Sequence, residues 1–356
     1  MQVYYYSLLF CIIFRGIVGA ISQHCSWNKK TEIKISLFVI STVLALVAGF
    51  RGPSVGADTG TYVELFDDVS LIKQEPGFRA LCEAIHLFTD SSTVFQIVCA
   101  YIINGGMAIA CYRLSQKPFM SMTLWVLFFY YFASFNGTRQ YIAIVILVNS
   151  FYYASKKRWI AYTFCQLLAL SFHSSAFVGI LYPVIFALDN GVRKHRYVVV
   201  FVTLVLVSIP ILWERIEPFI IRYMPTYGFY LTSKLTNVVT GGGIRQLVMN
   251  FCITAAFFFL QDRNVEVHRK YDAVLIIAVV LSGIQMWMQA FDRFLWYFEV
   301  FSIITIPEVL RDDNSRLTSS SKQVFAIAIL AVGFLFMSYY FMMRIHGVVP
   351  YVFYIG

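Results

Sequence analysis

Apolar runs of about 20 residues recur along the chain, and this feature restricts the fold more than any other. A run of this length can cross the hydrocarbon core of a bilayer as a helix, which satisfies its backbone hydrogen bonds internally. Only 13% of the 356 residues are charged, about half the usual share in a soluble domain. A β-barrel would show short alternating segments instead. The sequence therefore predicts an all-α, polytopic membrane helical bundle.

The apolar runs predict about twelve transmembrane helices within a single transmembrane domain that covers residues 1–356. Their approximate ranges are 3–23, 33–50, 93–112, 119–135, 139–155, 159–173, 174–190, 197–213, 244–261, 271–290, 293–310 and 323–343. Two longer loops, about 51–92 and 213–245, are expected to carry short helices. In the first loop we predict an amphipathic helix at the membrane surface, with an apolar face made of Phe78, Leu81, Ile85 and Phe88.

Basic residues give the expected orientation, because lysine and arginine gather in cytoplasmic loops. Every second loop is rich in them, and these loops hold 17 of the 28 basic residues. Both longer loops then lie on the outer face. The net charge of +9 is mainly a signal of topology. No nucleic-acid motif accompanies it, so nucleic acid is not an expected partner.

The basic residues left on the outer face are mostly arginines at predicted helix ends. The planar guanidinium offers two parallel donors to phosphate oxygens, so such a group predicts an anionic ligand that bears phosphates. The alternative is that these side chains reach lipid headgroups. The candidates for diphosphate binding are Arg51, Arg139, Arg245 and Arg293. We expect Arg51, Arg139 and Arg293 to converge on one outer-face cavity.

The titratable residues favour no metal or cofactor. The seven cysteines show no disulfide framework and no paired zinc spacing. P-loop, Gly-x-Gly-x-x-Gly and His-Glu-x-x-His motifs are absent from the sequence. Asp67 and Asp68 are interpreted as a solvated helix face. His173 differs from the loop histidines because it ends a predicted span beside three serines, although a purely structural histidine is the alternative.

Five short motifs at the outer face, taken in order, resemble the EpsG-type polysaccharide polymerases, a branch of the Wzy-like repeat-unit polymerases. The first is an arginine that ends a span, followed by "VGADTGTY" (Val55 to Tyr62). The others are "EPGF" (Glu75 to Phe78), "TRQYIA" (Thr138 to Ala143), "FHSSA" (Phe172 to Ala176) and "DRFLWYFE" (Asp292 to Glu299). The resemblance extends along nearly the whole chain and departs mainly in the second outer loop.

The resemblance implies a GT-C-like membrane glycosyltransferase in the bacterial cytoplasmic (inner) membrane, with its active site facing the periplasm. It would transfer a growing chain from one undecaprenyl diphosphate onto a new lipid-linked repeat, as an O-antigen or capsule polymerase does. The undecaprenyl-diphosphate-linked oligosaccharide would be both donor and acceptor. A flippase and a chain-length regulator are the expected protein partners. No cofactor or metal is implied.

In such a reaction arginines would stabilise the departing diphosphate, and a general base would help the attacking hydroxyl. His173, Asp58 and Glu75 are the candidates for the base. His173 is preferred because it ends a firm helix, whereas a neighbouring arginine would weaken Asp58 as a base. Thr59, Tyr62 and Gln140 are assigned to substrate positioning.

Three other functions remain open from the sequence: a flippase for lipid-linked sugars, an O-antigen ligase and a non-catalytic scaffold. A flippase would distribute charged residues through the middle of its spans. Here charge gathers at one face, and Arg15 is the one basic residue predicted near the middle of a span. The pattern favours the polymerase.

Overall fold

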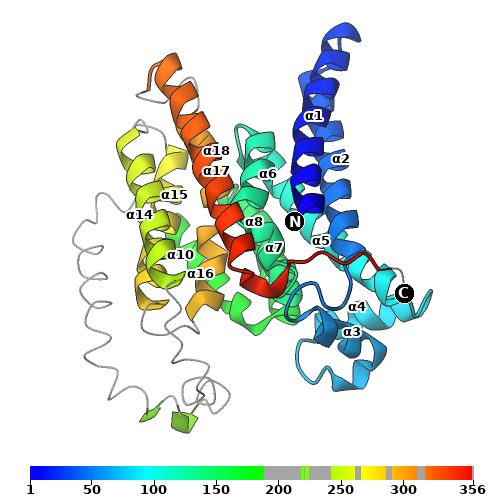
Figure 1. Cartoon of the computed structure of the whole chain (residues 1–356). Coiled ribbons are helices and arrows are strands. Elements are labelled where there is room, and N and C mark those ends of the chain that lie inside the picture. The colour runs from blue at the N-terminus through cyan, green and yellow to red at the C-terminus, as the bar shows by residue number, and fades with distance from the viewer. Residues whose placement is uncertain are drawn as a thin grey trace. The chain divides into compact units, whose positions relative to one another are not determined.

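The computed structural model describes residues 1–187, 218–219, 221–223, 242–260, 266–285, 291–310 and 317–354. Figure 1 shows the described helices. They belong to two compact units. The first unit comprises Met1–Gly179 and Leu317–Gly356, and the second comprises Ile180–Arg316. The predicted span 197–213 and nearly all of the second outer loop lie outside the described residues.

The described elements are helices, and the one β-type pairing among them is an isolated bridge between Arg51 and Phe353. The first unit contains α1 (Gln2–His24), α2 (Lys29–Gly49), α3 (Thr59–Asp67), η1 (Val69–Leu71), α4 (Pro76–His86), α5 (Ser92–Leu114), α6 (Pro118–Leu127), α7 (Tyr130–Ala133), α8 (Thr138–Ser155), α9 (Trp159–Phe172), α18 (Ser319–Met342) and η5 (Ile345–Gly347). The second contains α10 (Leu181–Ala187), α14 (Gly242–Leu260), α15 (Glu266–Gln285), α16 (Asp292–Glu299) and α17 (Ser302–Val309). The 3₁₀ segment η2 (Ser174–Ile180) joins α9 to α10.

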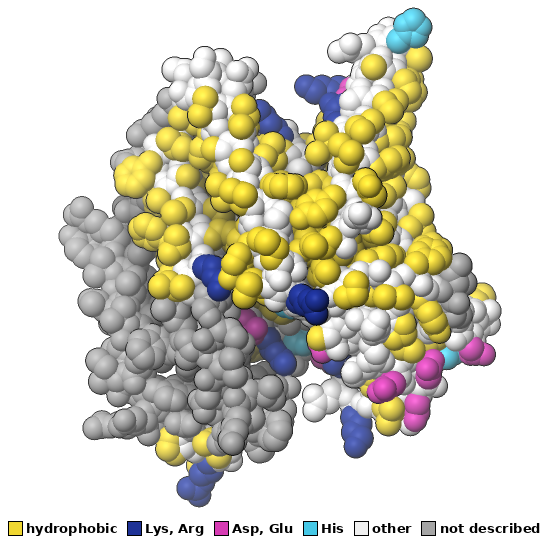
Figure 2. Space-filling model, viewed as in Figure 1, with side chains coloured by type: hydrophobic (Ala, Val, Ile, Leu, Met, Phe, Trp, Pro, Cys, Tyr) yellow, Lys and Arg dark blue, Asp and Glu magenta, His cyan; other side chains and the backbone are white. Residues whose placement is uncertain are grey.

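Four helices of the described part, α1, α2, α5 and α18, are long and apolar enough to cross a membrane. Their outward surfaces are apolar as well. On α1, Leu9, Ile13 and Ile17 are exposed, and Ile327 and Leu335 are exposed on α18. Figure 2 shows hydrophobic side chains over both helices, and acidic side chains gathered over the region of α3 and α4. Apolar helices of this length with exposed apolar surfaces are stable in the hydrocarbon core of a bilayer, so the protein is membrane-embedded.

Other predicted spans are divided into shorter helices, so a count of twelve is not confirmed. The range 119–135 contains α6 and α7, with Phe129 between them at φ 70°. The range 293–310 divides between Glu299 and Ser302. These segments are apolar because they are buried inside the protein, where broken helices are tolerated. Hydropathy alone does not separate a buried broken helix from a lipid-facing straight one.

The charge of Arg15, which the sequence places near the middle of a span, is balanced within the first unit. Its Nη1 lies 2.7 Å from Glu32 Oε1 on α2. The guanidinium also lies over the ring of Phe119, 4.3 Å from its centre. An ion pair with an aromatic partner removes most of the cost of placing this cation in an apolar region. Arg15 therefore joins α1 to α2 and α6.

The first outer loop is folded around an aromatic cluster. The ring of Phe66 on α3 stacks on those of Phe95 and His86, with centres 4.6 Å and 4.1 Å apart. Phe78 on α4 packs edge-on against Phe95. The predicted amphipathic helix is confirmed as α4, with one difference in its apolar face. Cys82 is buried on that face, whereas Phe88, beyond the end of the helix, is 88% exposed.

The C-terminal segment pairs with the loop that follows α2, although the two are about 300 residues apart in sequence. Gly56 N–H donates to Gly347 O at 3.0 Å, and Ala57 N–H donates to His346 O at 3.1 Å. Further along, Gly52 N–H donates to Val352 O at 2.8 Å. Backbone hydrogen bonds of this kind fix the path of an otherwise irregular loop. The segment after α18 thus holds the "VGADTGTY" loop in place.

In the second unit, polar side chains hydrogen-bond between packed helices. Gln246 Nε2 donates to Glu299 Oε2 at 2.5 Å, which links α14 to α16. Asn250 Nδ2 donates to Ser282 Oγ at 2.7 Å, which links α14 to α15. Asn250, Ser282 and Glu299 are buried. Hydrogen bonds like these join helices in an apolar environment.

Candidate active site

The first unit holds eight of the ten residues that the sequence proposes for the site. They are Arg51, Asp58, Thr59, Tyr62, Glu75, Arg139, Gln140 and His173. Arg245 and Arg293 belong to the second unit. The expected convergence of Arg51, Arg139 and Arg293 therefore stays a prediction.

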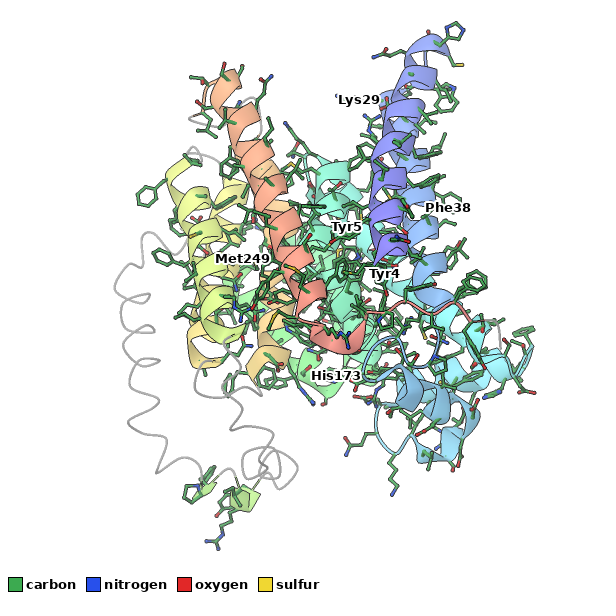
Figure 3. The ribbon with its side chains drawn as sticks, viewed as in Figure 1. Tyr4, Tyr5, Lys29, Phe38, His173 and Met249 are labelled. Atoms are coloured by element: carbon green, nitrogen blue, oxygen red, sulfur yellow. The ribbon has the colours of Figure 1, made fainter. Side chains whose placement is uncertain are left out.

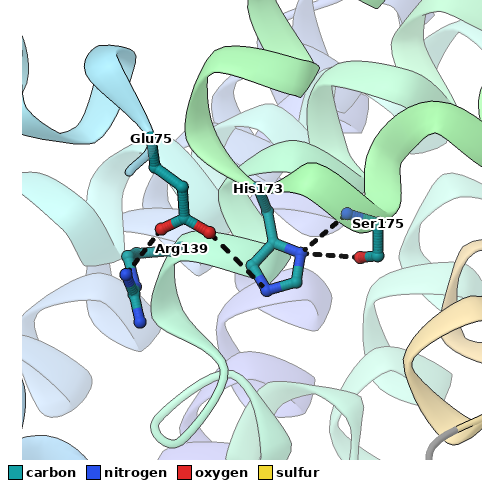
Figure 4. A network of polar contacts seen from close by, with 4 residues as sticks. All are labelled: Glu75, Arg139, His173 and Ser175. Carbon is teal, nitrogen blue, oxygen red and sulfur yellow. Dashed lines mark hydrogen bonds and ion pairs between the residues drawn. The ribbon is translucent and has the colours of Figure 1, made fainter. Parts of the chain in front are cut away.

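A carboxylate, a guanidinium and an imidazole meet within the first unit (Figure 4). Glu75 Oε2 accepts from Arg139 Nη1 at 2.6 Å. The other carboxylate oxygen, Oε1, lies 3.9 Å from His173 Nε2. The Glu75 and His173 side chains are 10% and 13% exposed, and that of Arg139 is 30% exposed. His173 lies at the end of the first unit where α3 and α4 are found (Figure 3).

The backbone at Glu75 is in an uncommon conformation. This residue immediately precedes α4 and has φ 69° and ψ 68°, in the left-handed region. The following Pro76 restricts it further, because proline disfavours helical angles in the residue before it. Strained residues of this kind persist only where the surrounding structure requires them, and they cluster at functional sites. This backbone conformation places the Glu75 carboxylate within hydrogen-bond distance of Arg139.

Close packing of α4 against α9 brings Glu75 to His173. A Cβ at Gly77 would lie 2.2 Å from Ser171 Oγ and 2.9 Å from Ser171 Cβ. Only glycine permits this approach. The last turn of α9 can therefore touch the first turn of α4, and the residues just outside these turns, Glu75 and His173, lie close together.

Arg139 is held between aromatic rings near the start of α8. Its guanidinium carbon lies 5.5 Å from the centre of the Tyr62 ring and 5.6 Å from that of Phe78. Cation–π contact and the ion pair with Glu75 together fix the orientation of the guanidinium. Burial raises the pKa of the Tyr62 phenol, although Arg139 opposes this effect. Tyr62 is consequently a neutral hydroxyl at physiological pH.

Ser175 holds the ring of His173 from the opposite side. The backbone N–H of Ser175 donates to His173 Nδ1 at 3.3 Å. Its hydroxyl oxygen lies 2.6 Å from the same ring nitrogen. His173 itself follows the last turn of α9 in extended backbone, so its ring leaves the helix axis and faces Glu75.

The sequence model of the EpsG family matches residues 34–353. The chain belongs to the EpsG family. A search of curated proteins found no match. A search of solved structures found none either. Family membership indicates a polysaccharide-polymerase-like membrane protein with glycosyltransferase-like activity, which agrees with the resemblance seen in the motifs.

In this EpsG-family chain, Arg51 and Thr59 bond to each other and both contact Phe135. Arg51 is 4% exposed, and it donates from Nε to Thr59 Oγ1 at 3.2 Å and from Nη1 to the carbonyl of Ala48. Burial lowers the pKa of Arg51 to about 10, which leaves it charged at neutral pH. Gly56, at φ 96°, makes the turn between them. These contacts stabilise the loop, and their proposed roles toward diphosphate and substrate stay predictions.

The two remaining candidates of the first unit differ in exposure. Asp58 occupies the exposed N-cap position of α3 without a side-chain capping hydrogen bond, and its charge contributes to raising the pKa of Tyr62. Gln140 is buried in the first turn of α8, one residue after Arg139. Among the described residues, no group of three or more histidine, cysteine, aspartate or glutamate side chains is arranged to hold a metal ion.

Sequence reasoning missed two contributors to this region of the EpsG-family fold. Ser175 fixes the His173 ring. Its position in the "FHSSA" motif, two residues after His173, is the sequence feature that could have indicated this role. Asn136 donates from Nδ2 to His346 Nδ1 at 2.9 Å and to His346 O at 3.0 Å. No local pattern predicts that contact, because 210 residues separate its partners.

Proposed function

We propose that this EpsG-family protein is a GT-C-like glycosyltransferase that lengthens a lipid-linked polysaccharide. The donor would be a growing chain on undecaprenyl diphosphate, and the acceptor a new lipid-linked repeat unit. The reaction would take place at the periplasmic face of the inner membrane and supply O-antigen or capsular polysaccharide. A flippase would deliver the repeat, and a chain-length regulator would limit the product.

The observation that carries this proposal is the meeting of Arg139, Glu75 and His173 in a half-enclosed site. A glycosyl transfer from a lipid diphosphate needs positive charge at the leaving group and a group that accepts a proton from the attacking hydroxyl. Arg139 has five N–H donors, and Glu75 engages one of its two terminal nitrogens. Tyr62 is a second hydrogen-bond partner, and terminal N–H donors that neither residue engages would serve phosphate oxygens. Arginine would supply the charge that a metal ion supplies in other transferases.

The place of the site in the first unit also supports the proposal. The site is built from the loop after α2, the start of α4, the start of α8 and the end of α9. Lys29 and Lys30 at the start of α2, and the basic turn Lys156–Arg158 between α8 and α9, are at the opposite ends of these three helices from the site. By the positive-inside rule these basic residues are cytoplasmic. The site would then face the side at which lipid-linked repeats are polymerised.

Chain extension by the purified protein tests this function. The full chain would be reconstituted in liposomes with a polyprenyl-diphosphate-linked repeat unit, and the products separated by length. A ladder of products is expected, and Arg139→Ala should abolish it. Arg79→Ala is a matched control, because Arg79 also pairs with a glutamate, Glu83 at 2.8 Å, but on the exposed face of α4.

The outcomes separate the proposed function from its alternatives. Transfer of the glycan to a different acceptor without lengthening would indicate a ligase. Movement of the lipid-linked repeat across the bilayer without new glycosidic bonds would indicate a flippase. Equal ladders from Arg139→Ala and Arg79→Ala would remove Arg139 from the site.

A further inference from the structure

Resting on the proposed function, we propose that Glu75 is the proton acceptor of the transfer and that His173 is a hydrogen-bond donor to the acceptor hydroxyl. The sequence alone favours His173 as the base. The contacts of the imidazole ring in the structure instead favour Glu75 as the base.

The backbone of Ser175 determines which nitrogen of His173 carries the proton. A backbone N–H can only donate, and that of Ser175 points at Nδ1, 3.3 Å away. Nδ1 must therefore offer its lone pair, and the proton of the neutral ring sits on Nε2. The Ser175 hydroxyl, 2.6 Å from Nδ1, can donate to the same lone pair. Ser175 is thus a positioning residue that leaves His173 no basic nitrogen facing the site.

The opposite side of the ring faces a carboxylate. His173 Nε2 lies 3.9 Å from Glu75 Oε1, which is too far for a direct hydrogen bond. An oxygen placed about 2.8 Å from each atom would meet them at an angle of roughly 90°. A sugar hydroxyl in that place would accept from Nε2–H and donate to Oε1. Among the described residues, Glu75, before α4, forms the ion-pair contact with the ring, and Arg139, on α8, pairs with the other oxygen of that carboxylate.

The chemical step follows from this arrangement. The acceptor hydroxyl oxygen forms a bond to the anomeric carbon of the donor glycan. The bond between that carbon and the diphosphate oxygen breaks, and its electron pair leaves with the lipid diphosphate. The hydroxyl proton passes to Glu75 Oε1, which becomes a neutral carboxyl group and later returns the proton to water. His173 holds the hydroxyl through Nε2–H and stays neutral throughout.

Arg139 orients Glu75 in the resting site and leaves it suited to this step. A carboxylate is a sufficient acceptor when the hydroxyl becomes acidic as its bond to the anomeric carbon forms. Arg139 contacts Oε2, and the oxygen that faces His173 is Oε1. The ion pair therefore orients the carboxylate and leaves the second oxygen for the proton.

Two substitutions at His173 separate a donor from a base in the chain-extension assay. The glutamine amide N–H can replace Nε2–H, so His173→Gln should keep activity within about tenfold of wild type. His173→Ala should lose roughly 100-fold or more. Glu75→Gln keeps the shape but not the charge and should lose about 10²- to 10⁴-fold. An inactive His173→Gln enzyme beside an active Glu75→Gln enzyme would overturn the assignment.

A spectroscopic measurement tests the histidine without relying on turnover. The full chain would be labelled with ¹⁵N in its six histidine rings, and the His173 signals identified by their loss in His173→Gln. We expect the neutral ring at pH 8 to carry its proton on Nε2. A proton on Nδ1 of the neutral ring would refute the proposal even if Glu75→Gln failed to fold.

The two measurements also separate this inference from the function on which it rests. If wild-type protein makes no polymer but His173 remains the Nε2–H form, the proposed function fails and the assignment of the ring stands. If the protein polymerises but His173 carries its proton on Nδ1, the function stands and the roles of Glu75 and His173 are reversed.

Discussion

Replacing Gly77 by alanine is expected to slow chain extension by about 100-fold, although residue 77 carries no chemistry. The added Cβ would lie 2.2 Å from Ser171 Oγ, 2.9 Å from Ser171 Cβ and 3.1 Å from the backbone carbonyl carbon of Ser171. Non-bonded carbon atoms rest about 3.5–4.0 Å apart. The start of α4 must therefore retreat from α9 by roughly 1 Å.

That retreat acts directly on the site. Glu75 is two residues before Gly77, so it moves with the first turn of α4. Its Oε1 lies 3.9 Å from His173 Nε2, so the shift would change the angle at which a bridging hydroxyl meets the two atoms and its aim at the donor glycan. A misplacement of about 1 Å in a catalytic arrangement costs on the order of 100-fold in rate. Overpacking itself should lower the free energy of unfolding by about 1–3 kcal/mol.

Chain extension in liposomes and thermal unfolding would be measured for Gly77→Ala, Ser171→Gly and the double variant. Ser171→Gly removes two of the three close atoms, so the double variant should recover most of the lost rate. Gly105→Ala on α5 is the matched control, because no atom lies within 4 Å of a Cβ at that position. A wild-type rate for Gly77→Ala, or purely additive effects in the double variant, would refute the reasoning.

Three further predictions concern charge. Arg139→Lys should lose roughly 30- to 1000-fold in the chain-extension rate, nearly as much as Arg139→Ala, because lysine lacks the planar fork; full activity in the lysine variant would contradict this. Chain extension should be unchanged by EDTA, and loss with EDTA that magnesium restores would overturn the arginine-based mechanism. Burial lowers the pKa of His346 to about 4, and its Nδ1 accepts from Asn136. The ordinary pKa of a histidine in the unfolded chain is about 6.5, so the neutral ring stabilises the folded state fully above about pH 6.5. This stabilisation is lost as pH falls through 4, by about 3 kcal/mol in total. Thermal unfolding of His346→Phe should lack this acid dependence, and identical pH profiles for the variant and the wild type would contradict the assignment.

The sequence predicted those parts of the fold that depend on local pattern. The spacing of Phe78 and Ile85 predicted α4, and the long apolar runs predicted α1, α2, α5 and α18. These elements follow from periodicity and from the length needed to cross a bilayer, both of which are local properties. Glu75, Arg139 and His173 could be selected because each stands in a motif at a predicted outer helix end.

The geometry that assigns their roles could not be predicted, because it depends on contacts between distant segments. The proton of His173 is placed by the backbone of Ser175, and a backbone N–H has no sequence signature. The break at Phe129 could not be predicted from hydropathy, because the segment is apolar on both sides of it. Its burial depends on which helices pack around it. Arg51 contacts Thr59 and the distant Phe135, which no local pattern predicts, and its role toward diphosphate stays a prediction.

The four residues of "EPGF" show how a weak motif can specify an active-site arrangement. Glu75 supplies the carboxylate in a left-handed conformation, and Pro76 begins α4 at a position where its missing N–H costs nothing. Gly77 allows the contact with α9, and Phe78, fully buried, presents its ring to Arg139. Each residue type meets a different physical requirement, and all four requirements concern the position of one carboxylate. A substitution at any of them should therefore change the relation of Glu75 to Arg139 before it changes the overall fold.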